Sequence, residues 1–366
     1  MIKIILILII SILILSNVEN FNNYKTSCSS NKLPKLLQKT LDKKKMIQNS
    51  FNWDYYIPCG YNKCEKQVRK LKGLNSKKIF MIDGCDSIAS KNRIFKILKK
   101  KYGKNASMIM PETFNLRKKC DMVNFIDHFK NKTKNGHITK YILKNNKQRQ
   151  LGLKLVNSVS QIKEEMKNKE FYLVQDFLNN PFLLNKRKIN LRYYFVIICR
   201  NGKVEAYIYN DGFMYYTPKY FQPNSIDKDR NITTGYIDRQ VYVENPLTTQ
   251  DFRKYLGTER ADHFDKMVRK KFKLMANALK DEICNVDEYP NSTLFQLFGA
   301  DIAPNEDLDV HFMEINKGPD MGGKDKRDSD LKLNMLDGIF ELVDIKKCND
   351  TNILKICNKV NYDRIL

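Results

Sequence analysis

The chain has 366 residues, 42% of them apolar, which excludes a disordered protein and allows a sizeable core with about two or three subdomains. Its formal net charge of +24 comes from short runs of Lys and Arg along the whole sequence. Such a charge indicates either solvated surfaces in a Lys-rich chain or a polyanionic partner. Nucleic acid, an anionic membrane and an acidic protein segment all remain open as that partner.

An apolar stretch occupies residues 4–15, next to the N-terminus. It is short for a bilayer span, which needs about 20 residues, and fits the hydrophobic region of a signal peptide better. The following Ser16-Asn17-Val18 is a poor cleavage site. We therefore expect residues 1–18 to be a signal peptide or a signal-anchor, and the protein to be membrane-associated or secretory. Basic residues are denser after the stretch, so an uncleaved segment favours a cytosolic body.

Residues 19–76 are basic and carry no motif, which predicts an irregular lead-in. The nine cysteines are an odd number at scattered spacings and include no CxxC pair. The sequence therefore supports neither a disulfide framework nor a zinc site.

Regular structure is predicted from residue 77 onward. Strands and helices are mixed, and several strands are linked by hairpins, which predicts an α+β fold rather than a doubly wound parallel sheet. No Gly-rich loop of the P-loop or Rossmann kind is present. The predicted elements are a strand at 77–84, an amphipathic helix at 90–103, a strand and loop at 106–116, strands at 140–146 and 171–178, a hairpin at 190–212 around Asn201-Gly202, and a long helix at 262–284.

Polar residues interrupt the last apolar segment, "LFQLFGADIAPNEDLDVHFMEIN" at residues 294–316. One strand ends at Asp301, a turn follows, and a second strand carries Glu314 and Asn316. Alternation along this strand predicts that Leu308, Val310 and Phe312 share a face with Glu314 and Asn316. An apolar face ending in a carboxylate and an amide indicates a site, because these oxygen ligands suit Mg²⁺.

The spacing of this hairpin leaves the metal site open. A symmetric hairpin turning near Glu306 pairs Asp301 with His311, which places Asp301 and Glu314 about 10 Å apart at about 3.3 Å per residue. A shared metal therefore requires an asymmetric loop or strongly twisted strands. The alternative is a hairpin whose acidic ends face water.

Six segments in order resemble the tubulin-tyrosine ligase family, ATP-grasp enzymes that join amino acids to tubulin and other acidic proteins. The resemblance extends from about residue 90 to 343. The segments are MPETFNL (110–116), YILK (141–144), VQDFLNNPFLLNKRKINLRYYFVI (174–197), YIYNDGFMYYTPKYF (207–221), NITTGYI (231–237) and FQLFGADIAPNEDLDVHFMEIN (295–316).

The resemblance implies an ATP-grasp fold of mixed and antiparallel sheets with flanking helices, preceded by a small N-terminal α/β subdomain. The nucleotide is expected between the central and C-terminal subdomains. The predicted divisions after the lead-in are an N-terminal subdomain at 77–139, a central subdomain at 140–185, a C-terminal subdomain with the metal site at 186–345, and a tail at 346–366.

The resemblance also implies roles for individual residues. Asp301, Glu314 and Asn316 are expected to hold Mg²⁺. Lys144 and Arg192 are the expected catalytic residues, with Lys144 on the ATP phosphates and Arg192 on the transferred phosphoryl group or the acyl phosphate. Further nucleotide contacts are expected from Lys91, Arg149, Gln175, Asp176, Leu178, Lys188, Asn190 and Thr233.

The sequence also departs from the family pattern. The Gly-rich flap reads "NNKQRQLGL", with Gly152 as its one glycine and Arg149 near the usual basic position. Asp176 stands for the hinge lysine and Asn190 for an acid of the ribose site. Tyr215 replaces an arginine that helps to hold acidic reactants, so the choice of acceptor or amino acid is in doubt there.

The resemblance implies an ATP-dependent carboxylate–amine ligase. It would add Glu, Gly or Tyr to an acidic acceptor such as a tubulin tail through an acyl phosphate, as a monomeric catalytic unit. Two alternatives are a non-catalytic member that binds acidic tails and an ATP-grasp enzyme with another acceptor. An acidic tail also accounts for the basic charge, whereas nucleic acid accounts for the charge but for none of the six segments.

Overall fold

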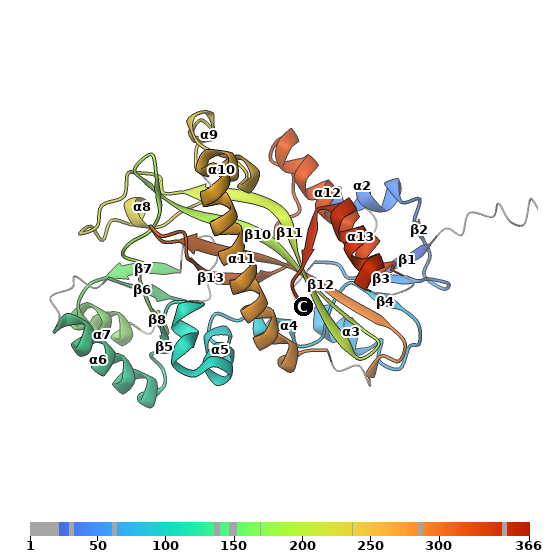
Figure 1. Cartoon of the computed structure of the whole chain (residues 1–366). Coiled ribbons are helices and arrows are strands. Elements are labelled where there is room, and N and C mark those ends of the chain that lie inside the picture. Colours follow the sequence, from blue (N-terminus) through green and yellow to red (C-terminus); the bar gives the residue numbers. More distant parts are fainter. Residues whose placement is uncertain are drawn as a thin grey trace, which may run out of the picture.

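Two β-sheets organise the chain, and the predicted α+β class is confirmed (Figure 1). A large sheet of ten strands carries helices on both faces, and a sheet of four strands lies beside it. The computed structural model describes residues 22–28, 33–60, 64–134, 140–145, 152–168, 170–235, 237–284, 288–345 and 350–366.

The large sheet has the strand order β14-β11-β10-β12-β4-β3-β1-β2, with β13 also on β12 and β9 on β10. The N-terminal strands pair in parallel up to β4 on β12, and the strands from β9 onward pair antiparallel. Its strands are β1 (Asn23–Thr26), β2 (Ile47–Gln48), β3 (Tyr55–Ile57), β4 (Lys78–Ile79), β9 (Leu183–Leu184), β10 (Arg187–Arg200), β11 (Lys203–Tyr216), β12 (Thr293–Pro304), β13 (Val310–Lys317) and β14 (Tyr362–Arg364).

The hairpin of β10 and β11 is the longest in the sheet, and its turn lies at the predicted Asn201-Gly202. Both turn residues have positive φ, 50° and 71°. This backbone suits a two-residue turn whose twist matches that of the flanking strands, and Asn-Gly is the dipeptide that adopts it most readily. The predicted hairpin is therefore confirmed.

Helices cover the two faces of the large sheet and bury separate apolar clusters. The face toward the first cluster carries α3 (Cys64–Arg69), α4 (Cys85–Ile88), α5 (Ile94–Tyr102), α10 (Thr249–Leu256) and α11 (Thr258–Leu279). The face toward the second carries α2 (Lys35–Lys43), α12 (Lys326–Val343) and α13 (Asp350–Val360). The remaining short elements outside the small lobe are η1 (Gly103–Met108), α8 (Lys228–Asn231), α9 (Val241–Glu244) and η2 (Lys280–Glu282).

The N-terminal part of the chain corrects two predictions. Residues 19–76 are not an irregular lead-in, because they supply β1, α2, β2, β3 and α3, and Tyr24, Tyr55 and Leu41 are buried in the second cluster. Disulfides link Cys28 to Cys59 and Cys199 to Cys284. These pairs are 31 and 85 residues apart in sequence, so no local spacing indicated them.

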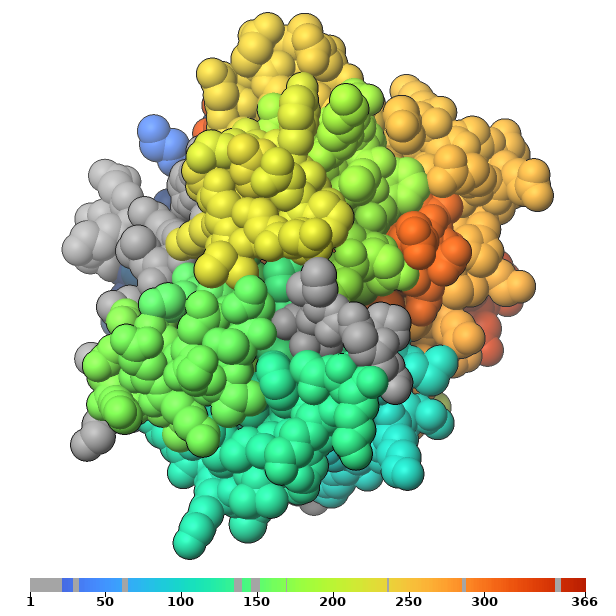
Figure 2. Space-filling view, turned by 90° about the vertical axis from the view of Figure 1, so that its left-hand side faces the viewer, coloured from blue at the N-terminus to red at the C-terminus, as the bar shows by residue number. Residues whose placement is uncertain are grey.

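The small sheet, in the order β5-β8-β6-β7, forms what we call the small lobe together with α6 (Lys119–Thr133) and α7 (Val159–Lys167). The helices pack on one face of the sheet, and the other face meets Phe221 and Ile232 of the large-sheet body. Figure 2 shows this lobe, in teal to green, against the yellow segment that contains these two residues. Its strands are β5 (Thr113–Asn115), β6 (Tyr141–Lys144), β7 (Leu153–Val156) and β8 (Leu173–Asp176).

The predicted membrane-associated or secretory localisation needs correction. In the part of the chain that the structure describes, no helix has the length and apolar character to cross a bilayer. The longest, α11, has charged residues along its exposed side and is held on the sheet by its apolar face. Residues 1–18, from which the prediction was made, lie outside the described residues.

A buried ion pair near the Asn201-Gly202 turn provides a test of the fold. Arg200 donates two hydrogen bonds of 2.9 Å to Glu205, and both side chains are buried. We expect Glu205→Ala to lower the free energy of unfolding by about 3–5 kcal/mol, because the Arg200 charge is left buried without its partner. Urea unfolding measures this, with the exposed Lys203→Ala of the same hairpin as the control. A loss below about 1 kcal/mol, which is typical of a solvent-exposed ion pair, would contradict the burial of Arg200 and Glu205.

Candidate functional site

A β-bulge in the hairpin of β12 and β13 brings two carboxylates together. Asp301 lies directly opposite Glu314, whereas Ile302 lies opposite Phe312, so Met313 is an extra residue in β13. The symmetric register, in which Asp301 pairs with His311, is therefore wrong, and the predicted separation of about 10 Å does not exist.

The same bulge corrects the prediction about faces. Phe312 packs in the first apolar cluster with Ile302, but Glu314 shares the opposite face with Asp301. Val310 also belongs to the first cluster. Glu314 therefore does not continue the apolar face of β13. It projects to the other side of the sheet because one inserted residue reverses the alternation.

Strand β10 supplies the polar neighbours of these carboxylates. Its residues Tyr194, Val196 and Ile198 belong to the second apolar cluster. Lys188, Asn190 and Arg192 continue the same alternating face toward the small lobe. This face of β10 thus carries site residues in its first half and residues of the second apolar cluster in its second half.

The cross-strand pair of Arg192 and Asp301 is the central contact of the site. The Arg192 Nε and Nη2 atoms donate to the two oxygens of Asp301, the second at 2.9 Å. Gly299 makes room for this guanidinium, because a Cβ there would lie 3.1 Å from Nη1 and 3.0 Å from Pro319. Two-point pairing of this kind fixes the orientation of both side chains.

Burial affects the two carboxylates differently. It raises the pKa of Asp301, and Arg192 opposes the shift without cancelling it. Burial also acts to raise the pKa of Glu314, but Lys91, Lys144 and a 2.9 Å hydrogen bond from Asn316 outweigh it and lower that pKa. An ionised Glu314 beside Asp301 is a pair that a proton or a cation stabilises.

The residues predicted to bind metal offer only oxygen donors toward a cation. Asp301 and Glu314 contact each other, and Asn316 lies beside Glu314. This donor set fits Mg²⁺, with both oxygens of Asp301 currently bonded to Arg192. Within the described ranges, no group of three His, Cys, Asp or Glu side chains forms a metal cluster. The metal assignment stays a prediction.

Two predicted lysines lie beside Glu314. The Lys91 Nζ is 4.0 Å from Glu314 Oε2 and donates to the Asn145 carbonyl at 3.4 Å. The Lys144 Nζ donates to the Met313 carbonyl at the bulge, 3.3 Å away, and burial lowers its pKa to about 8. The structure therefore brings both lysines together with the candidate metal ligands.

Two further lysines contact the same aromatic ring where the small lobe meets the large-sheet body. The Nζ atoms of Lys188 and Lys140 lie 4.0 and 4.3 Å from the centre of the Phe177 ring. Burial lowers the pKa of Lys188 to about 7, with Lys140 and Lys144 adding to the effect, and burial lowers the pKa of Lys140 to about 8. Sequence reasoning missed Lys140, which hydrogen-bonds Asn231 at 2.7 Å and so links the small lobe to the large-sheet body.

The residues predicted for the adenine slot point in different directions. Gln175 donates to Thr113 Oγ1 at 2.8 Å, which connects it to the Pro-x-Thr segment. The Asp176 carboxylate instead turns toward α6, where His128 and Lys132 contact it. Leu178 follows β8 and is half-buried. The sequence placed an acid beside the slot, but the Asp176 side chain faces the helix.

The remaining predicted nucleotide contacts are less constrained. Asn190 is partly buried, and its Oδ1 has no hydrogen-bond partner within the described residues. Thr233 is half-buried after α8, close to the bridge between Thr234 and Tyr216. Arg149 and the flap residues 146–151 lie outside the described residues.

A charged pocket adjoins the carboxylates on the side of Tyr215. The Arg192 guanidinium lies 5.4 Å from the centre of the Tyr215 ring, and Gly235 packs against that ring. Tyr215 is thus a wall of the pocket. The lining residues are Arg192, Tyr194, Phe213, Tyr215, Gly235, Arg239, Tyr242, Asp320, Lys324, Asp328 and Lys332.

Sequence reasoning missed the charged residues of this pocket that follow β13. Lys332 pairs with Asp328 at 2.9 Å at the start of α12, and both are buried. Lys324 donates to the Gly235 carbonyl at 3.0 Å, and burial lowers its pKa. The available signal was the i, i+4 spacing of Asp328 and Lys332 in a helix directly after the Glu-x-Asn strand.

A family model describing the tubulin-tyrosine ligase family matches residues 69–352, which include the small lobe and every residue of the site described above. The chain belongs to the tubulin-tyrosine ligase family. The resemblance of the six segments is thereby confirmed.

Relatives in this family carry names that refer to glutamylation. The chain is 29% identical over 185 residues to "Probable tubulin polyglutamylase TTLL9" of Rattus norvegicus, a match covering 48% of this chain and 39% of that protein. It is 22% identical over 264 residues to "Probable alpha-tubulin polyglutamylase Ttll1" of Tetrahymena thermophila, covering 66% and 61%. The match to "Tubulin polyglutamylase TTLL7" of Xenopus tropicalis is 23% over 206 residues, covering 50% and 23%. The chain thus covers well under two thirds of the TTLL9 and TTLL7 relatives.

The buried Lys188 predicts a pH effect on stability. Its ordinary pKa is 10.5 and its pKa in the folded chain is about 7, so between these values the unfolded state binds more protons. The free energy of unfolding therefore rises with pH across this window. We expect ligand-free Lys188→Met to have a higher Tm than wild type below pH 7, with an advantage that shrinks toward pH 10.5.

Thermal unfolding across this pH range measures the effect. Lys203→Met is the control, because Lys203 is exposed at the far end of the same hairpin. An advantage of Lys188→Met that stays constant with pH would show that burial does not lower the pKa of this lysine.

Proposed function

We propose that this chain is an ATP-dependent carboxylate–amine ligase that adds an amino acid to an acidic protein acceptor such as a tubulin tail. The observation that carries the proposal is a group of buried lysines where the small lobe meets the large-sheet body, together with the adjoining carboxylates. These lysines are Lys140, Lys144 and Lys188. Family membership and the names of the relatives support the same reaction class.

The lysines suit a nucleotide triphosphate. Burial lowers the pKa of each of the three, which means that their protonated forms are unfavourable in the ligand-free protein. A triphosphate would relieve it and keep the lysines protonated. Lys144 and Lys91 would contact phosphates, and Gln175 and the backbone after β8 would line the adenine slot.

Asp301, Glu314 and Asn316 would hold Mg²⁺. The ion would neutralise phosphate charge during phosphoryl transfer. For one Asp301 oxygen to be free for it, Arg192 would have to release one of its two hydrogen bonds. This exchange would free guanidinium donors for the transferred phosphoryl group.

The proposed ligase reaction has two steps. An acceptor carboxylate oxygen attacks the γ-phosphorus, the bond to the ADP oxygen breaks, and an acyl phosphate forms. The amine of the incoming amino acid then attacks the acyl carbon, phosphate leaves, and the nitrogen loses a proton as the amide forms. Arg192 would stabilise the oxygens that gain charge in both steps.

The pocket beside Tyr215 would receive the incoming amino acid. Its charged residues include both signs, with Lys324 and Arg239 for a carboxylate and Asp320 for an ammonium group. Whether Glu, Gly or Tyr is added depends on how the amino-acid side chain fits against Tyr215.

A non-catalytic protein that binds acidic tails is the second candidate. The observation that favours it is Tyr215, which stands where the family resemblance leads us to expect an arginine. Incorporation of radiolabelled amino acids into intact and tail-cleaved tubulin, with ATP, separates the two candidates. Incorporation that needs both ATP and the tail supports the ligase, and tail binding without incorporation supports the alternative.

Glu314→Gln tests the metal assignment. The substitution keeps the side-chain volume and removes one of the two charged ligands, so we expect loss of Mg²⁺-dependent ATP turnover with Tm preserved. Glu306→Gln in the exposed turn of the same hairpin is the control. Titration of Mg²⁺ against a bound fluorescent ATP analogue gives a readout that is independent of activity. Turnover within about twofold of wild type would reject the assignment.

Tyr215→Arg tests the amino-acid pocket. A guanidinium at this position would offer a carboxylate a charge-assisted hydrogen bond of about 1.5–3 kcal/mol, or about 10- to 150-fold in affinity. We expect a lower KM for the amino acid and an almost unchanged KM for ATP. Tyr215→Phe is the control for the loss of the hydroxyl group. A variant that changes neither constant, or only that for ATP, would show that Tyr215 does not contact the amino acid.

A further inference from the structure

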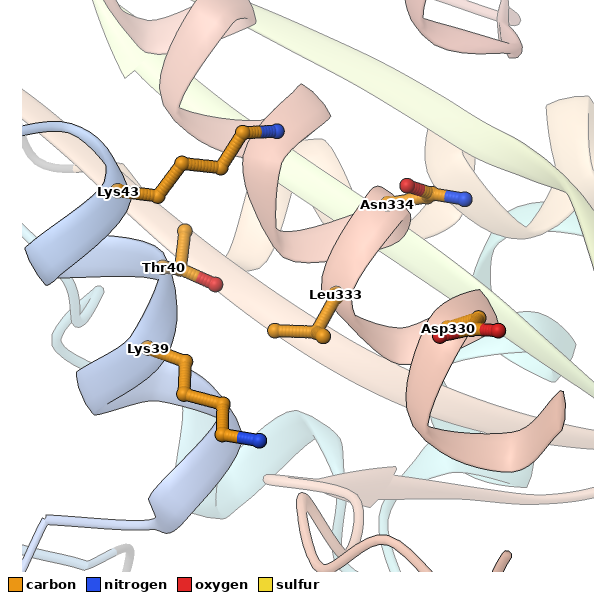
Figure 3. Close-up of a pocket in the computed structure, with 6 residues that line it drawn as sticks. All are labelled: Lys39, Thr40, Lys43, Asp330, Leu333 and Asn334. Carbon is orange, nitrogen blue, oxygen red and sulfur yellow. The ribbon is translucent and has the colours of Figure 1, made fainter. Parts of the chain in front are cut away.

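A groove lies between α2 and α12, on the face of α12 that points away from the amino-acid pocket (Figure 3). Figure 3 shows the two helices side by side, with Leu333 toward the space between them and Asp330 and Asn334 extending from the side of α12 farther from α2. The lining residues are Lys39, Thr40 and Lys43 of α2 and Asp330, Leu333 and Asn334 of α12.

One wall of this groove is not part of the family match. The match begins at residue 69, whereas α2 spans Lys35–Lys43. Leu36, Leu37 and Leu41 anchor α2 in the second apolar cluster, which α12 shares. The helix is therefore fixed on the body of the protein by its apolar side, and the groove exists because α2 and α12 pack together.

The exposed side of α2 is basic. Lys35, Lys39 and Lys43 are exposed and recur every four residues, which places them along one face of the helix. Within the described residues no carboxylate pairs with Lys39. Lys43 and Lys44 share one carboxylate, that of Asp337, at 2.7 and 2.9 Å.

The carboxylates around the groove do not cancel this charge. Asp330 lines it but pairs with the exposed Lys326, and Glu341 pairs with Lys44 at 2.9 Å and with Lys359 at 3.4 Å. On α2 itself, Asp42 accepts a hydrogen bond from Gln38. The lysines thus outnumber the acids they meet, and an anionic ligand would gain from them.

The groove lies within reach of the proposed site. Asp328 and Lys332 of α12 line the amino-acid pocket with Arg192, and Asp330 and Leu333 of the same helix line the groove. A helix with its side chains is about 10–12 Å across, so a path around it from one face to the opposite face is about 16–19 Å, which about five to six residues of extended peptide span at about 3.3 Å each.

We propose that this groove docks an acidic, Glu-rich stretch of the acceptor, about five to six residues from the side chain that reaches Arg192. This assignment rests on the proposed function. An acidic peptide is favoured over nucleic acid because the lining contains no aromatic side chain on which a base could stack. Leu333 gives the peptide an apolar contact between the lysines of one wall and Asn334 of the other.

Binding of a fluorescein-labelled Glu-rich peptide, followed by fluorescence anisotropy, tests the groove. The Lys39→Gln/Lys43→Gln variant should bind it about 3- to 10-fold more weakly, since each exposed ion pair is weak on its own. Asp337 keeps Lys44 as its partner in this variant, so the fold should be preserved. Binding by wild type should also weaken with salt and with a Gln-for-Glu peptide.

The matched control is Lys266→Gln/Lys270→Gln, which removes the same charge at the same spacing from the exposed side of α11. Equal losses in the two variants would show that net charge alone attracts the peptide and would overturn the proposal. An unchanged affinity in the α2 variant would also overturn it. The proposal would likewise be overturned if a DNA oligonucleotide lost as much affinity as the peptide when Lys39 and Lys43 are replaced.

Binding of a fluorescent ATP analogue and amino-acid incorporation are measured on the same proteins. The α2 variant should bind the analogue as wild type does and incorporate less at limiting acceptor. If wild type shows neither nucleotide binding nor incorporation but holds the peptide through Lys39 and Lys43, the ligase proposal fails and the groove stands.

Discussion

The extra residue at Met313 is the constraint on which the whole site depends. Without it, strand alternation would direct Glu314 into the apolar cluster that contains Phe312. With it, Glu314 lies opposite Asp301 on the other face, and the Met313 carbonyl accepts a hydrogen bond from Lys144 of the small lobe. One inserted residue therefore aims a carboxylate at its partner and also contributes a contact between the two sheets.

The site is electrostatically unfavourable in the absence of a ligand. Three lysines are buried with lowered pKa values, and Asp301, a buried carboxylate with a raised pKa, contacts a second one. Packing fixes these groups in place: Phe177 lies under Lys140 and Lys188, and Gly299 leaves space for Arg192. A polyanion with a divalent cation would neutralise both kinds of charge at once. Binding of such a ligand would therefore remove the free-energy cost of these buried charges, and that gain would add to its affinity.

The sequence predicts those features that depend on local patterns. Asn201-Gly202 specifies its turn, and the apolar spacing of residues 262–284 specifies the long helix, which spans Thr258–Leu279. The ordered motifs identify the family. The bulge could not be predicted, because nothing in "VHFMEIN" distinguishes a bulged strand from a regular one; only its pairing with β12 does. The direction of Asp176 and the presence of Lys140 likewise follow from how the lobes meet, which no single segment encodes.

Residues N-terminal to the family match contribute both to the large sheet and to the groove beside α12. Residues before the match at 69–352 add strands in parallel to the sheet edge at β4, and they bring α2 onto α12. The Cys28–Cys59 disulfide ties this addition together from within. Because α12 lines the pocket beside Tyr215 on one side and meets α2 on the other, a peptide bound at α2 would be positioned relative to Arg192 by this one helix. If the groove docks the acceptor as proposed, substitutions on the exposed side of α2 would change acceptor binding while the residues around Arg192 stay as they are.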